Sequence, residues 1–157
     1  MPPECELNTM KLKQLSIFLE NSPGRLLKVT RALGEAGINL RALNLAGSTD
    51  FGVLRFICSD LHKARNIAMQ NQWPARVDDV LAVRISDNPG SLADILQPLS
   101  ENSIDVEYMY AFTRFSTSEA LIIFGFREIE EAIKVLQSCN AALVSAEDFK
   151  ALESTED

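Results

Sequence analysis

Apolar and polar residues first alternate along the chain and then follow a helical period. Residues 13–20 place apolar side chains at every second position, apart from Phe18, which is typical of a half-buried strand. After a Pro-Gly turn, residues 26–36 carry apolar side chains at helical spacing, and Gly37 follows where a helix commonly ends. These patterns predict a strand, a turn and an amphipathic helix.

The next residues predict the second half of a βαββαβ unit. Residues 38–46 alternate with one step out of phase, residues 47–50 have the composition of a hairpin turn, and residues 51–58 form a further apolar strand. Asp60 is a suitable N-cap for a second helix, which should end near residues 71–74, before another strand begins.

The same plan occurs a second time, 66 residues later. The segment Asn21 to Leu26, NSPGRL, returns as Asp87 to Leu92, DNPGSL, and the match continues without a gap through the neighbouring strand and helix. The remaining elements of the second copy are predicted at residues 107–112, 119–126, 129–136, 141–145 and 147–152. Such self-similarity indicates an internal duplication.

The duplication sets the expected boundaries. The predicted parts are a disordered leader, two repeats and an acidic tail, at residues 1–10, 11–79, 80–152 and 153–157. Asp78 and Asp79 are the only break between the repeats, and so short a join favours repeats that pack against each other. Pro98 falls inside the first helix of the second repeat and is expected to kink or shorten it.

Composition excludes several classes of protein. The chain has 157 residues, 46% of them hydrophobic, with no segment resembling a signal peptide and no apolar run near the roughly 20 residues of a membrane span. We therefore expect a cytoplasmic protein without a membrane partner. Cys5, Cys58 and Cys139 lie far apart, which argues against a disulfide framework and offers no metal-ligand spacing.

The net charge of −7 is unevenly distributed. Residues 11–79 contain ten Lys or Arg and six Asp or Glu, whereas residues 80–157 contain five and fourteen. A basic half and an acidic half could pair within the chain or between chains, or could be solvated surfaces with an accidental asymmetry. The negative total disfavours a general nucleic-acid binder.

The repeated turn is the best candidate for a ligand site. Proline presets φ and glycine has no Cβ, so a ligand can approach the backbone closely, where the first N–H groups of the helix have no intrahelical partner. Such a turn suits an anion, for instance a carboxylate. The alternative is that Asn21 and Asp87 only initiate turns and cap helices, with no ligand.

The two Asn/Asp-x-Pro-Gly-x-Leu turns, together with the steps Gly37 to Asn39 and Ser103 to Asp105 before the second strands, resemble the ACT domain. The resemblance covers nearly the whole chain, twice. It implies an α+β fold of two ferredoxin-like βαββαβ repeats packed side by side, with antiparallel sheets and helices on one face. It also implies a stand-alone, non-catalytic regulatory protein without cofactor or metal. Such a protein binds an amino acid or a similar effector, forms a homodimer and acts on an unidentified regulated protein.

In ACT domains, ligands lie between two modules, where the turn of one faces the second strand of the other. By resemblance, a carboxylate would meet N–H groups at residues 25–27 or 91–93, and an ammonium would meet side-chain oxygens nearby. The implied ligand-binding residues are Asn21, Pro23, Gly24, Arg25, Leu26, Leu27, Asn39 and Leu40, and Asp87, Asn88, Pro89, Gly90, Ser91, Leu92, Asp105 and Val106. Because acids replace amides in the second repeat, we expect two unequal sites.

Other functions stay open from the sequence. Small acylphosphatases share the ferredoxin-like fold, and Arg25 and Asn39 could imitate their functional pair, but no phosphate-binding loop, Cys-His pair or Ser-His-Asp set accompanies them. Tyr108, Tyr110 and Phe112 share one strand face, where we expect core or interface instead of a platform for RNA bases. A dimerisation module with vestigial pockets is the main alternative.

Overall fold

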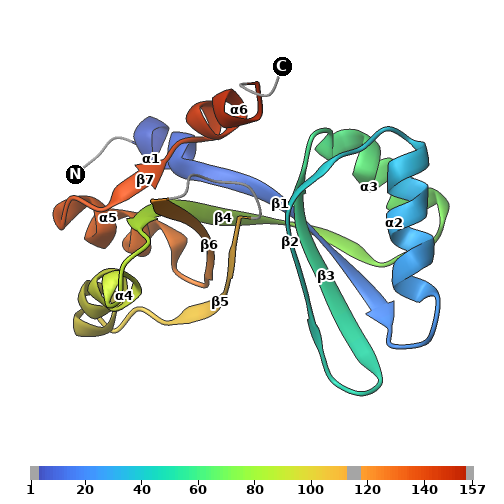
Figure 1. Ribbon diagram of the computed structural model, residues 1–157, viewed down its shortest axis with the longest axis horizontal. Coiled ribbons are helices and arrows are strands. Elements are labelled where there is room, and N and C mark those ends of the chain that lie inside the picture. The colour runs from blue at the N-terminus through green and yellow to red at the C-terminus, as the bar shows by residue number, and fades with distance from the viewer. Residues whose placement is uncertain (1–3, 113–117, 155–157) are drawn as a thin grey trace. The chain divides into compact units, whose positions relative to one another are not determined.

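The computed structural model describes residues 4–112 and 118–154 and forms two compact units (Figure 1). We call Lys13–Asp78 the first-repeat unit, and Met1–Leu12 with Asp79–Asp157 the second-repeat unit. Each unit has its own hydrophobic core. No helix among the described residues is long and apolar enough to cross a membrane.

The first-repeat unit has the predicted βαββαβ order. Its elements are β1 (Lys11–Glu20), α2 (Arg25–Glu35), β2 (Leu40–Gly47), β3 (Phe51–Cys58), α3 (Leu61–Gln70) and the beginning of β4 (Ala75–Ser86). The strand order is β2-β3-β1-β4, with antiparallel pairing of β1 and β2 to β3. Asp60 caps α3, since its carboxylate accepts a hydrogen bond from the Lys63 N–H at 3.0 Å.

Both helices of this unit cover one face of its sheet. Leu15, Ile17 and Leu19 of β1 are buried together with apolar side chains of α2 and α3. The break in alternation that the sequence shows in β2 corresponds to a register shift between Leu40 and Ala42. A β-bulge of this kind turns the later side chains of the strand to the opposite face.

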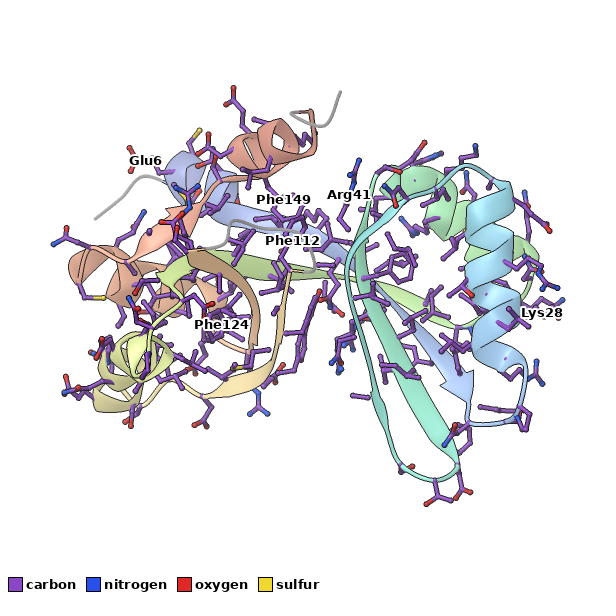
Figure 2. All side chains as sticks on the ribbon, viewed as in Figure 1. Glu6, Lys28, Arg41, Phe112, Phe124 and Phe149 are labelled. Atoms are coloured by element: carbon purple, nitrogen blue, oxygen red, sulfur yellow. The ribbon has the colours of Figure 1, made fainter. Side chains whose placement is uncertain are left out.

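The second-repeat unit repeats this plan. After β4 it contains α4 (Ser91–Glu101), β5 (Val106–Ala111), β6 (Glu119–Phe126), α5 (Ile129–Ser138), β7 (Ala142–Val144) and α6 (Ala146–Ser154), with strand order β5-β6-β4-β7. The stripe of Ile129, Ala132, Ile133 and Leu136 on α5 is buried, as its spacing predicts. Phe124 of β6 belongs to the same core (Figure 2).

The N-terminal segment is not the disordered leader that its composition predicts. Residues Glu4–Met10 form helix α1, and residues 1–3 lie outside the described part of the chain. Leu7 is buried in the core of the second-repeat unit, and Met10 packs against that core. So short a helix is unstable alone. Contacts of α1 with α5 and α6 stabilise it, and a local sequence pattern cannot reveal them.

The expected break at Asp78 and Asp79 is also absent, because β4 runs through both residues as one strand of 12 residues. Asp78 is accommodated by hydrogen bonds from Ser16 Oγ at 2.8 Å and from Arg76 Nε at 2.6 Å. Satisfying the carboxylate in this way removes the main cost of an acid in a strand. The predicted acidic tail is partly taken up by α6, and residues 155–157 lie outside the described residues.

Pro98 does not shorten α4, which spans 11 residues, as α2 does. A proline at this position removes the hydrogen bond to the carbonyl of Asp94, which lies on an exposed residue where water can replace the lost donor. Asn102 ends the helix, because its main-chain and side-chain N–H groups both donate to the Pro98 carbonyl, at 3.2 and 2.8 Å.

The aromatic residues of β5 and its end are used inside the second-repeat unit, as expected. Tyr110 is buried, and the ring of Phe112 meets that of Phe149 on α6 edge to face, with centroids 5.4 Å apart (Figure 2). Tyr108 lies opposite Gly125 on β6, and its ring covers the place where a Cβ would stand. The row therefore offers no open stacking platform.

Candidate functional site

The two Pro-Gly turns have the same backbone geometry. Gly24 and Gly90 take the left-handed conformation, with φ of 86° and 91°, and each is the N-cap of the following helix without a side-chain cap. A Cβ built on either glycine would meet no described atom within 4 Å. A ligand can therefore approach this backbone closely, as the sequence predicts.

One of the three N–H groups proposed in each turn is already engaged. The Arg25 N–H donates to the Ser22 carbonyl at 3.3 Å, and the Ser91 N–H donates to the Asn88 carbonyl at 3.2 Å. Both bonds close the turn itself, since a chain reversal over four residues pairs its first carbonyl with its fourth N–H. The prediction that these two groups are free for a ligand is wrong.

The next two N–H groups of each helix have no acceptor in the described part of the chain. The intrahelical bonds begin one step later, with Lys28 donating to Gly24 at 3.0 Å and Asp94 donating to Gly90 at 3.1 Å. This leaves the N–H groups of residues 26 and 27, and of residues 92 and 93, at the positive end of a helix dipole. Two parallel donors at such an end suit one carboxylate.

Asn21 has a structural role that its sequence context does not reveal. Its side-chain Nδ2 donates to the carbonyls of Ser48 and Thr49, at 3.2 and 3.0 Å, and so fixes the β2–β3 turn beside the Pro-Gly turn. Asp87, at the equivalent position of the second repeat, has no side-chain N–H and cannot make these bonds when ionised. The amide-to-acid change therefore alters the anchoring of a hairpin as well as the charge.

The second half of the predicted site lies at the other end of the helix. Asn39 exchanges hydrogen bonds with Ser59, through its N–H to Ser59 Oγ and through its carbonyl to the Ser59 N–H, both at 3.0 Å. It follows α2, whereas Gly24 precedes α2. Eleven helical residues rise about 16 Å. Asp105 and Gly90 stand at opposite ends of α4 in the same way.

One unit alone therefore does not bring the two halves of the predicted site together, and the site between two modules stays a prediction. Three of the predicted ligand-binding residues, Leu40, Leu92 and Val106, pack against the cores of their units. Leu26 and Leu27 beside the first turn are 38% and 55% exposed. Arg25 is paired with Glu20 at 3.1 Å, so its guanidinium is partly neutralised.

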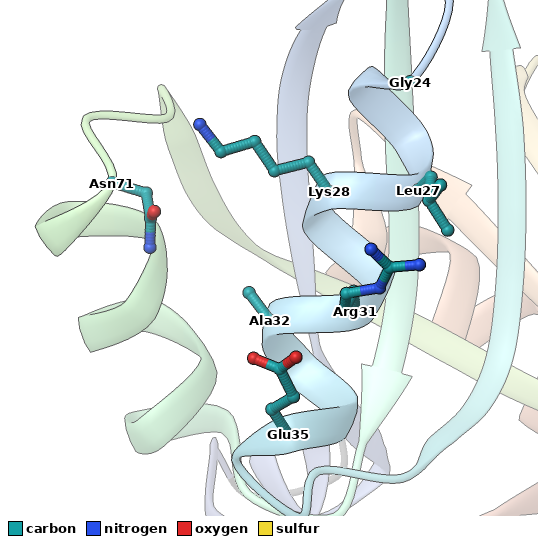
Figure 3. Close-up of a pocket in the computed structure, with 7 residues that line it drawn as sticks. All are labelled: Gly24, Leu27, Lys28, Arg31, Ala32, Glu35 and Asn71. Atoms are coloured by element: carbon teal, nitrogen blue, oxygen red, sulfur yellow. The ribbon is translucent and has the colours of Figure 1, made fainter.

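The first turn continues into a hollow on the outer side of α2 (Figure 3). The hollow has a volume of about 330 Å³ and is lined by Gly24, Leu27, Lys28, Arg31, Ala32, Glu35 and Asn71. Figure 3 shows Lys28 and Asn71 pointing into the space between α2 and the end of α3. Sequence reasoning missed the polar lining, although the spacing of residues 24, 28, 31 and 35 places them on one helical face.

The charged groups of the described residues do not meet the requirements of a metal site. The described residues contain no group of three or more His, Cys, Asp or Glu side chains that could hold a metal ion. Lys11 donates a hydrogen bond to Glu130 at 2.5 Å and, with the N-terminal backbone of α5, lowers the pKa of that carboxyl. This pair joins β1 to α5 and lies on neither Pro-Gly turn.

A family model described as an ACT domain pair matches residues 10–153. The chain belongs to the ACT-domain family. Its first-repeat and second-repeat units are the two ACT modules, which confirms the family and the fold expected from the sequence. A search of curated protein sequences gave no match.

Solved structures share the fold of this ACT pair. Protein BT0572 from Bacteroides thetaiotaomicron is 39% identical, with a TM-score of 0.83 over 90% of this chain and 96% of that chain. The ligand-free regulatory subunit of aspartate kinase from Thermus thermophilus is 17% identical, with a TM-score of 0.57 over 80% and 90%. Aspartate kinase from Clostridium acetobutylicum is 14% identical, with a TM-score of 0.54 over 82% of this chain and 33% of that chain. At these last two identities the likeness shows the fold alone.

Proposed function

We propose that this ACT pair is a non-catalytic regulatory protein that binds a small effector, an L-amino acid, between ACT modules. The observation that carries the proposal is the repeated turn, in which a positive-φ glycine with open space beside its Cα precedes two helix N–H groups that have no acceptor among the described residues. A carboxylate there would accept two hydrogen bonds and interact favourably with the helix dipole. A zwitterion fits because Asn39, and Asp105 in the second module, can accept hydrogen bonds from an ammonium.

A second copy of the chain is proposed to complete each site. Among the described strands, β2 and β5 are the edges of their units and each pairs with one strand, so their outer backbone groups can pair with another chain. Leu43 and Leu45 on β2 are 40% and 51% exposed, and Met109 on β5 is 37% exposed. Pairing of such edges in a twofold dimer would cover these side chains and bring a turn near a second strand of the partner.

The two kinds of turn are proposed to differ in affinity. In the first module Asn21 holds the neighbouring hairpin through neutral hydrogen bonds, whereas Asp87 brings a negative charge close to the second turn. That charge opposes a bound carboxylate. The first turn is therefore the stronger site for an amino acid.

The test is a thermal-shift screen of the purified protein against L-amino acids, with D-isomers and acylphosphate hydrolysis as controls. A ligand at 100 times its Kd adds about 2.7 kcal/mol of stability. For a chain of this length that is a shift in Tm of roughly 5–10 °C. A shift with one or a few L-isomers is the expected result.

Binding variants then locate the site. Gly24→Asp places a carboxylate where the ligand carboxylate would lie and should reduce affinity at least about tenfold. Gly34→Asp adds the same charge to the same helix, on an exposed residue with open space around its Cα, and should bind as the parent does. Equal affinity in the parent and in Gly24→Asp would refute the site.

The exposed apolar side chains of β2 also favour a second candidate, a dimerisation module without ligand. That function predicts a stable dimer and no shift with any amino acid. For regulation, the ligand must in addition favour one of two states of the protein, since equal binding to both would change nothing. Sedimentation with and without the identified ligand measures this difference.

A further inference from the structure

The helix layers of the two units have the same construction and opposite charge. We define the basic layer as α2 and α3, and the acidic layer as α4 and α5. The first helix of each layer has 11 residues after a positive-φ glycine, and the second has 10. The basic layer contains five Lys or Arg and one Glu, whereas the acidic layer contains four Asp or Glu and one Lys.

Two pairs of opposite charges occur at equivalent positions of the helices. Lys28 and Asp94 are both the fourth residue of their helix, and Lys63 and Glu131 are both the third. Duplicated helices that differ in this way have similar lengths and carry opposite charges. Complementary potentials steer association and set its register.

Several charges of both layers have no oppositely charged partner within the described chain. Lys28, Arg31 and Arg65 of the basic layer and Asp94 of the acidic layer are exposed and form no ion pair there. Figure 2 shows Lys28 on the side of α2 that faces away from its sheet. These charges are therefore available to another molecule.

The basic layer also has a shape that can receive a neighbouring helix. Its hollow of about 330 Å³ follows the α2 face from Gly24 to Glu35, and the small side chain of Ala32 lies one helical turn after Lys28 on the side toward α3 (Figure 3). Apolar side chains of the layer are exposed as well: Leu27, which lines the hollow, is 55% exposed, and Met69 on α3 is 67% exposed. Docking would bury these side chains while pairing the cations with acids.

We propose that the basic layer of one copy docks on the acidic layer of a second copy, through a contact separate from the edge strands of the proposed ligand-binding dimer. Because each copy carries both layers, the contact forms either a reciprocal pair or a head-to-tail series. Two helices about 16 Å long offer far less area than the roughly 800 Å² per partner of a standard interface. One contact is therefore weak and strongly dependent on salt.

Sedimentation velocity of the full chain tests the contact at several protein concentrations, in about 50 mM and about 500 mM NaCl. Screening shortens the reach of exposed charges from more than 10 Å to a few ångströms over this range. The parent should show a concentration-dependent species that disappears at high salt. Edge-strand pairing depends on backbone hydrogen bonds and apolar contact, so a dimer that persists in high salt reports on that other interface.

Two charge-reversal variants give the decisive comparison. Variant one carries Lys28→Glu and Arg31→Glu, and variant two carries Asp94→Lys and Glu101→Lys. Each should lose about tenfold or more of the salt-sensitive self-association, because neither variant keeps two oppositely charged layers. Variant one has three cations and three acids in its basic layer, and variant two has three cations and two acids in its acidic layer. Mixing the two variants should restore it. The net charge of −7 changes by four in each and stays negative in both, so net charge cannot drive the mixed association.

The proposal is overturned if the parent shows no salt-sensitive species, if both variants associate as the parent does, or if the mixture fails to associate. Amino-acid binding measured on variant two keeps this inference separate from the proposed function. Variant two leaves Gly24, the hollow beside it and the edge strands unchanged, so its ligand binding reports on the proposed first-turn site alone. If the parent protein binds no amino acid, the proposed function is refuted, whereas the proposed contact between the basic and acidic layers is not.

Discussion

Gly125 and Tyr108 form a cross-strand pair whose energy can be worked out from the structure. The two residues lie opposite each other on β6 and β5. A Cβ on Gly125 would stand 2.2 Å from Tyr108 Cζ and 2.5 Å from both Cε atoms. Since ordinary contact begins near 3.4 Å, Gly125→Ala must displace the ring by more than about 1 Å, and overpacking of this kind costs about 1–3 kcal/mol.

Part of that cost is offset, because alanine has less conformational freedom than glycine in the unfolded chain, by about 0.4–1 kcal/mol. We expect Gly125→Ala to reduce the free energy of unfolding by about 1–2 kcal/mol. In a Tyr108→Ala background the obstacle is gone, and the same change should be neutral or slightly stabilising. The coupling free energy between Gly125→Ala and Tyr108→Ala is therefore about as large as the effect of Gly125→Ala alone, with the opposite sign.

Urea unfolding of the parent, both single variants and the double variant measures this coupling, provided that the m-values agree. Gly52→Ala is the matched control in the other unit, because its Cβ would make only ordinary contacts, with the end of the Leu45 side chain at 3.4 Å and the Ala46 carbonyl oxygen at 3.7 Å. It should change stability by less than about 0.5 kcal/mol. If Gly125→Ala cost the same with and without the Tyr108 ring, the packing argument would be refuted.

Two further predictions concern polar contacts. Asn21→Asp removes the side-chain donor to the Ser48 and Thr49 carbonyls and should reduce the free energy of unfolding by about 1–2 kcal/mol. Amide hydrogen exchange in the β2–β3 hairpin should become faster. Unchanged exchange would contradict the anchoring role. Lys11→Met should lower stability by up to about 1 kcal/mol near pH 7, because the Lys11 pair holds the pKa of Glu130 below its ordinary value. That contribution is present above the unfolded pKa and is lost as the pH falls through the folded pKa, so parent and variant should converge in acid.

Local sequence signals predicted most of the elements and the two turns. Alternation, helical spacing and the Asp60 cap depend on residues a few positions apart, and the βαββαβ order followed from them. In β2, the break in the alternation of apolar and polar residues corresponds to the register shift between Leu40 and Ala42. The left-handed Gly24 and Gly90 were predictable for the same reason, since a strand-to-helix turn through Pro-Gly requires a residue that tolerates positive φ.

Of the candidate site, only the Pro-Gly turns were predictable from the sequence. That the Pro-Gly turns leave helix N–H groups without an intrahelical partner could be expected from the sequence, whereas the use of the Arg25 and Ser91 N–H groups in turn bonds could not. The turn bonds depend on the actual dihedral angles. The polar lining of the hollow beside Gly24 depends on how α2 and α3 pack, because Asn71 belongs to a different element from the other lining residues.

What the sequence by itself determined is therefore most of the elements, their duplication and the left-handed glycine of each Pro-Gly turn, because short-range sterics and hydrophobic period decide them. Tertiary structure alone decided that α1 folds onto a core through Leu7, that β4 passes through Asp78, and that Asn21 holds a hairpin 27 residues away. Each of these depends on a partner distant in the chain. From its local sequence, a polar or acidic residue is predicted to lie in a loop or on the surface. Only the tertiary structure shows which distant group forms its hydrogen bonds.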